Sequence, residues 1–77
     1  MLAKKLDVTG RACPIPIVEL MRAMGPLEGG QEIEIRADDR AFPADVKAWC
    51  SKTGHVLIEI TQNGEAFTAR VKKKPTK

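Results

Sequence analysis

Cys13 is the residue best suited to chemistry in this 77-residue sequence, because Pro14 and Pro16 follow it closely. Proline is tolerated in the first turn of a helix, where backbone N–H groups have no partner within the helix. Pro14 also disfavours the α conformation at Cys13, which suits an N-cap residue. The positive end of the helix dipole would then lower the pKa of the thiol, and Arg11 adds a charge of the same tendency. The pattern predicts a nucleophilic sulfur where a helix begins.

Two points at this junction have alternative interpretations. Ile15 also precedes a proline, so either the first turn is irregular or the helix begins nearer Pro16. An unpaired cysteine is often only a small buried hydrophobic residue. Gly10 and the two prolines, however, place Cys13 near the surface at a strand-to-helix junction. These neighbours favour a functional role for the thiol.

The composition indicates one small domain spanning residues 1–77, with a folded core at about 4–72 and a flexible basic tail at 73–77. The net charge is +3, and no aromatic residues interleave with a basic face, so direct nucleic-acid binding is not favoured. The chain has no apolar run of membrane-spanning length and begins without an apolar signal region, which predicts a cytoplasmic protein with reduced thiols. One histidine, two cysteines and no Cys-x-x-Cys motif predict neither a metal site nor a cofactor.

Hydrophobic periodicity predicts six elements in the order β-α-β-α-β-β. Helical crossovers would make the first three strands parallel, and a type I′ turn at Asn63-Gly64 would make the fourth antiparallel. The expected fold is therefore α/β (α+β): a two-layer sandwich with a mixed four-stranded sheet and both helices on one face. The expected strands are 4–8, 31–37, 56–60 and 67–72, and the expected helices are 14–24 and a segment that starts between 40 and 43 and ends before Gly54.

Parallel βα units place Cys13 and the pair Asp38-Asp39 at one edge of the sheet, where ligands tend to bind. We expect one aspartate to cap the second helix. Alternatively, the pair selects partners or tunes the sulfur, although negative charge there would oppose thiolate formation. Three arginines offer either a cationic surface for an acidic partner or, as we favour, ordinary solvated charge: Arg11, Arg22 and Arg36.

His55 and Cys50 are expected to lie away from this chemistry. His55 opens the third strand at the opposite edge, where it would cap a backbone carbonyl. Cys50 lies on the apolar face of the second helix and is predicted to be a core residue. Helical rise separates Cys13 from Cys50 by roughly 10–15 Å, which is beyond the reach of a disulfide.

The sequence resembles the TusA-like (SirA-like) sulfur-carrier family, whose mark is a Cys-Pro-x-Pro motif. The resemblance implies a fold like the C-terminal domain of bacterial translation initiation factor three. It also implies a sulfurtransferase in which Cys13 accepts sulfane sulfur as a persulfide and passes it to a partner. The matching residues are Leu6-Asp7, Gly10, Cys13-Pro14-x-Pro16, Gly30, Asp38-Asp39, Asp45-Val46, Trp49-Cys50, Gly54-His55, Gly64 and Phe67.

The implied partners are a donor, either a cysteine desulfurase or a rhodanese-like protein, and a downstream acceptor protein. The chain departs from many members at Thr9-Gly10-Arg11, where they read Arg-Gly-Leu, and at Arg40, where they have proline. Transfer-RNA thiolation, sulfur oxidation, molybdenum-cofactor supply and transporter-linked thiosulfate use are therefore all open as pathways of sulfur metabolism.

Two other functions are compatible with the residues. One is a non-catalytic regulatory module that binds a protein or RNA, in which Cys13 would be dispensable. The other is a redox-sensing thiol, although the sequence offers no resolving cysteine near Cys13.

Overall fold

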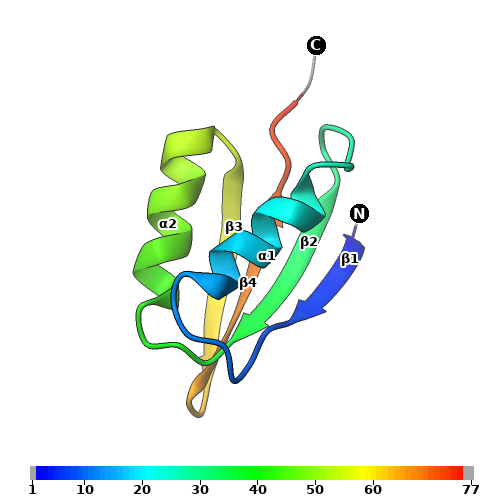
Figure 1. Ribbon diagram of the computed structural model, residues 1–77. Coiled ribbons are helices and arrows are strands. Elements are labelled where there is room, and N and C mark those ends of the chain that lie inside the picture. Colours follow the sequence, from blue (N-terminus) through cyan, green and yellow to red (C-terminus); the bar gives the residue numbers. More distant parts are fainter. Residues whose placement is uncertain (1, 76–77) are drawn as a thin grey trace.

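The computed structural model describes residues 2–75 and contains two helices packed on a four-stranded sheet (Figure 1). Both helices lie on the same face of the sheet, as the sequence predicts. The elements are β1 (Leu2–Asp7), α1 (Ile15–Met24), β2 (Glu32–Ala37), α2 (Phe42–Thr53), β3 (Val56–Asn63) and β4 (Ala66–Lys72).

The sheet is mixed and has the order β1-β2-β4-β3. β1 pairs with β2 in parallel, and β4 pairs antiparallel with both β2 and β3. The first three strands therefore run in the same direction, as predicted, but the last strand separates the second from the third. Ile35 of β2 marks the register, since it lies opposite Leu6 of β1 and Ala69 of β4.

The core lies between the sheet and the two helices. Alternating residues of β2 and β4 face the helices, and each helix contributes an apolar stripe at a spacing of three to four residues. Leu20 and Met24 of α1 are buried, whereas Met21 is 53% exposed. The fully buried core includes Leu20, Ile33, Ile35, Ala37, Val46, Ala69 and Val71.

The β3–β4 hairpin differs in detail from its prediction. Asn63 pairs with Ala66, so the two central residues of the turn are Gly64 and Glu65 rather than Asn63 and Gly64. Gly64 has a φ of 66°, and no non-glycine residue in the described chain has a positive φ. A positive φ at the first central position only is the pattern of a type II′ turn, not type I′.

The start of the predicted basic tail is an ordered part of the fold. The Lys73 ammonium donates hydrogen bonds to the carbonyls of Met24, Gly25 and Leu27, at 3.1, 3.0 and 2.6 Å. The Lys74 ammonium donates to the Thr53 carbonyl at 2.8 Å. The two lysines therefore satisfy carbonyls at the C-terminal ends of both helices, where a cation also interacts favourably with the helix dipole. Residues 76 and 77 of the predicted tail lie outside the described residues.

Neither helix within residues 2–75 is long and apolar enough to cross a membrane.

Candidate active site

Three connections meet at one end of the molecule: the β1–α1 loop, the β2–α2 loop and the β3–β4 turn (Figure 1). We call this end the Cys13 edge and define it by residues 8–14, 38–41 and 64–65. Its position follows from the topology, because β1 and β2 are parallel and both point toward it. The sequence-predicted residues Arg11, Cys13, Asp38 and Asp39 all belong to it.

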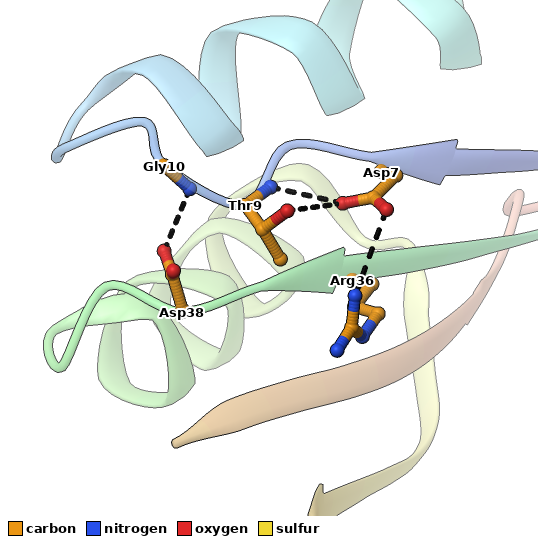
Figure 2. A network of polar contacts seen from close by, with 5 residues as sticks. All are labelled: Asp7, Thr9, Gly10, Arg36 and Asp38. Carbon is orange, nitrogen blue, oxygen red and sulfur yellow. Dashed lines mark hydrogen bonds and ion pairs between the residues drawn. The ribbon is translucent and has the colours of Figure 1, made fainter.

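The β1–α1 loop is fixed by hydrogen bonds to two aspartates (Figure 2). Asp7 accepts hydrogen bonds from the backbone N–H and the hydroxyl of Thr9, at 3.0 and 2.7 Å, and its carboxylate lies 3.6 Å from the guanidinium of Arg36. The hydrogen bonds from Thr9, together with the nearby Arg36, hold the pKa of Asp7 below its usual value. The Asp38 carboxylate accepts a hydrogen bond from the Gly10 N–H at 2.9 Å. Asp38 thus joins the loop to the end of β2.

The predicted aspartate cap of α2 is therefore wrong. The N-cap residue is Ala41, and no side chain caps the helix. Asp38 is engaged by Gly10, and Asp39 contributes only its backbone carbonyl, which accepts from the Phe42 N–H at 3.0 Å. A capping rule considers only local partners, whereas Gly10 lies 28 residues away in sequence.

Cys13 lies just before α1 rather than at its N-cap. The helix begins at Ile15 with Pro14 as its N-cap, and the Cys13–Pro14 peptide bond is cis. The Ile15 N–H donates to the Ala12 carbonyl at 2.9 Å, which forms a turn ahead of the helix. Of the two forms that the sequence allowed, the helix that begins nearer Pro16 is thus the one observed, and the Cys13 side chain ahead of it is exposed.

The thiol of Cys13 donates a hydrogen bond to Oδ2 of Asp45 at 2.9 Å. Asp45 lies in the first turn of α2, and its own N–H donates to the Ala41 carbonyl at 2.9 Å. Sequence reasoning did not select Asp45 as a site residue. The sequence did contain a signal for Asp45. It lies two residues after Pro43 and therefore near the start of the second helix, and both helices begin at the same edge of the sheet.

The pKa of the Cys13 thiol is raised, chiefly because the thiol donates to Asp45. Partial desolvation and the negative charges of Asp45 and Asp39 act in the same direction. The prediction of a lowered pKa is therefore wrong. It considered the dipole of α1 and the charge of Arg11 but not the carboxylate brought in by α2.

Asp39 completes the polar surroundings of the sulfur. Its Oδ2 is buried and has no hydrogen-bond partner among residues 2–75. The sulfur of Cys13 and one carboxylate oxygen from each of Asp39 and Asp45 all lie within 4.8 Å of one another. The surroundings of Cys13 are thus acidic.

The family model described as Sulfurtransferase TusA matches residues 4–73. The chain belongs to the TusA family. This confirms the family predicted from the sequence.

Relatives of this TusA-family chain cover nearly its full length. A protein of Neisseria meningitidis serogroup A is 36% identical over 96% of this chain and all of its own, and Bacillus subtilis YrkI is 41% identical over 91% of this chain and 93% of its own. Both are named "Putative sulfur carrier protein". The crystal structure of a SirA-like protein from Desulfitobacterium hafniense has a TM-score of 0.82 over 94% of this chain and 99% of its own, at 18% identity, and confirms the fold. Family and relatives together support a role in carrying sulfur.

The remaining predicted residues of the candidate site are not brought to the sulfur. Arg22 is exposed in the last turn of α1, whereas Cys13 precedes the first turn. Arg11 is exposed in the β1–α1 loop and is not among the groups that shift the pKa of Cys13. Pro16 is buried in the first turn of α1 and anchors the helix start.

Cys50 and His55 lie apart from the candidate site, as predicted. Cys50 is only 5% exposed, both cysteines are free, and burial raises the pKa of Cys50 to about 11. The His55 ring packs against Trp49 with 5.0 Å between the centroids and an interplanar angle of 35°. Its Nδ1 accepts a hydrogen bond from the Lys74 N–H at 3.0 Å. Within residues 2–75 the ring donates to no backbone carbonyl, so the expected carbonyl cap is not observed there.

A hollow of about 580 Å³ also lies at the Cys13 edge, lined by residues that do not include the cysteine. Cys13 is instead exposed on the β1–α1 loop. Asp38 and Arg40 line it from the β2–α2 loop, and Gln62, Gly64, Glu65 and Phe67 line it from the hairpin.

We assign no metal to the trio of Cys13, Asp39 and Asp45. Structural zinc sites use four sulfur or nitrogen ligands, whereas magnesium and calcium use oxygen ligands throughout. One thiol with two carboxylates matches neither pattern, and the thiol already donates to Asp45.

Proposed function

We propose that Cys13 accepts sulfane sulfur as a persulfide and transfers it to a partner protein. The observation that carries the proposal is the contrast between the two thiols of this TusA-family chain. Cys13 is exposed on a loop fixed by hydrogen bonds, whereas Cys50 is buried in the core. A sulfur that must meet a second protein has to be exposed, and only Cys13 meets this condition.

The loading step is a thiol exchange with no net redox change. The sulfur of Cys13 attacks the outer sulfur of a donor persulfide, and the donor's sulfur–sulfur bond breaks. The donor leaves as a thiolate and takes up the proton that Cys13 loses. A thiol and a donor persulfide thus become a Cys13 persulfide and a donor thiol. In delivery, an acceptor thiol attacks the outer sulfur of the Cys13 persulfide, and Cys13 leaves and regains a proton.

The raised pKa of Cys13 explains why the carrier would need its partners. At neutral pH the free thiol is largely protonated, and the thiolate is the nucleophile. Donor and acceptor proteins would therefore supply the activation that the isolated domain lacks. We propose a cysteine desulfurase or a rhodanese-like protein as the donor. We propose the cytoplasm as the location, because it is reducing and keeps thiols in the free form.

Mass spectrometry of intact protein tests the proposal. Reduced wild type, Cys13→Ser and Cys50→Ala proteins are each incubated with a cysteine desulfurase and cysteine, or with a rhodanese and thiosulfate. We expect wild type and Cys50→Ala to gain one sulfur atom with at least one donor, and Cys13→Ser to gain none. Loading of Cys13→Ser, or no loading of wild type with any donor, would contradict the proposal.

A further inference from the structure

The 2.9 Å contact between Cys13 Sγ and Asp45 Oδ2 depends on the proton of an empty carrier. A carboxylate only accepts hydrogen bonds, so the proton in this contact belongs to the thiol. Persulfide formation replaces that proton with a bond to a second sulfur. The loaded Sγ then has no hydrogen to donate, and the contact is lost.

The same distance restricts where the second sulfur can go. A sulfur–sulfur bond is about 2.05 Å long, so a second sulfur on the line from Sγ to Oδ2 would lie roughly 0.9 Å from the oxygen. This is far inside van der Waals contact. Because Cys13 is exposed, the second sulfur has room on the solvent side.

Charge acts in the same direction as this steric limit. Both groups that act on the thiol by charge are acidic, Asp45 from α2 and Asp39 from the β2–α2 loop. Anionic sulfur beside them is therefore disfavoured, whether it belongs to an empty thiolate or to a persulfide. An anionic outer sulfur is more stable away from the carboxylates.

We propose that Asp45 holds the empty Cys13 as a neutral thiol and, after loading, directs the outer sulfur away from the carboxylates toward solvent. Asp45 is thus a positioning residue that distinguishes the empty carrier from the loaded one. An empty carrier reacts slowly with stray electrophiles, whereas a loaded carrier presents its outer sulfur to an acceptor. This inference rests on the proposed persulfide function and assigns a second residue to the same site.

The test compares Asp45→Asn with Asp38→Asn in a Cys50→Ala background. Each variant loses one carboxylate, but Asp38 accepts from Gly10 rather than from the thiol, and an asparagine oxygen can keep that bond. Thiolate formation is followed by ultraviolet absorbance as the pH is raised, and circular dichroism verifies folding. Removal of one unit charge about 4 Å from the sulfur increases the thiolate fraction at neutral pH by about fivefold, even at the dielectric constant of water.

We expect the titration of Asp45→Asn to move to lower pH, and that of Asp38→Asn to follow the parent protein. Alkylation of the empty thiol at neutral pH should quicken by only about two- to threefold, because a more acidic thiolate is a weaker nucleophile. Coincident titrations of Asp45→Asn and the parent would overturn the inference. So would an equal shift in Asp38→Asn, because it would show a general effect of charge.

A second measurement addresses the loaded state without a donor protein. Each variant is loaded chemically with inorganic polysulfide, and the rate at which cyanide removes the outer sulfur is measured. We expect Asp45→Asn and the parent to differ by less than twofold, since the contact is absent once sulfur is bound. A difference as large as that in the empty state would refute the loss of this contact on loading, and with it the role of Asp45 in distinguishing the empty carrier from the loaded one. Failure of protein donors to load Cys13 would instead contradict the proposed function and leave both measurements on Asp45 valid.

Discussion

Replacement of Lys73 by methionine should destabilise the domain more than any other single charge change near the C-terminus. The Lys73 ammonium donates to the carbonyls of Met24, Gly25 and Leu27 at the end of α1. Methionine keeps much of the aliphatic stem but removes all three donors. The carbonyls of Met24 and Leu27 are bound in part-buried contacts, so water replaces the lost donor there only incompletely.

The magnitude follows from these contacts. Each part-buried hydrogen bond contributes about 1 kcal/mol net, and the favourable position of a cation at a helix C-terminus adds about 0.5 kcal/mol. The exposed bond to Gly25 adds little. Lys73→Met should therefore lower the free energy of unfolding by about 2.5 kcal/mol, which for a domain of this size lowers the Tm by about 10–20 °C.

Urea and thermal unfolding followed by circular dichroism measure this effect. Lys72→Met is the matched control, because it removes the same charge one residue earlier from an exposed position on β4. We expect Lys72→Met to stay within about 0.5 kcal/mol of wild type. Equal stability of the two variants would refute the reasoning, since it would mean that the ammonium adds nothing at the end of α1.

Two further predictions concern pH and backbone conformation. Burial, with the charges of Lys74 and Lys73, lowers the pKa of His55 below its ordinary value of 6.5, so the unfolded chain binds a proton more readily than the fold. The stability from this effect is fully present above pH 6.5 and is lost as the pH falls through the folded pKa. His55→Gln should therefore reduce the dependence of the free energy of unfolding on pH, as measured by urea unfolding. Parallel pH profiles for His55→Gln and wild type would contradict this assignment to His55. Gly54 has a φ of 89° and a Cβ there would lie 3.4 Å from Lys74, so Gly54→Ala should cost about 1–2 kcal/mol. Gly25 has a φ of −51°, and a Cβ there would lie 3.7 Å from the nearest atom, so Gly25→Ala should be neutral or stabilising by up to about 1 kcal/mol. Urea unfolding compares the two variants, and equal losses of unfolding free energy in Gly54→Ala and Gly25→Ala would refute this distinction.

The fold could be predicted largely because its signals are periodic. Ile33, Ile35 and Ala37 alternate with polar residues in β2, and Val46 and Cys50 recur at helical spacing in α2. Such patterns indicate which face of each helix and strand is buried. The helical connections between successive strands then indicate that those strands are parallel. They do not fix strand order, which depends on pairing partners far apart in the chain. The position of β4 between β2 and β3 therefore came only from the structure.

Only part of the candidate site could be predicted, because its decisive contacts are non-local. The prolines after Cys13 indicate a helix start, which is a local property. The hydrogen bond from Cys13 to Asp45 spans 32 residues, and that from Gly10 to Asp38 spans 28. Local rules treated Asp38 as a capping candidate and did not select Asp45 at all. Lys73 likewise resembled a solvated tail, because nothing in its neighbours indicates the carbonyls that it meets.

The central claim, that Cys13 carries the sulfur, is tested most directly by peptide mass spectrometry of the wild-type protein. The protein is loaded by a cysteine desulfurase with heavy-isotope cysteine, its thiols and persulfides are alkylated, and it is digested. We predict that the labelled sulfur is found on the peptide that contains Cys13 and leaves it when a reduced acceptor thiol is added. Label on the Cys50 peptide, or label that no acceptor removes from Cys13, would contradict a carrier role for this cysteine.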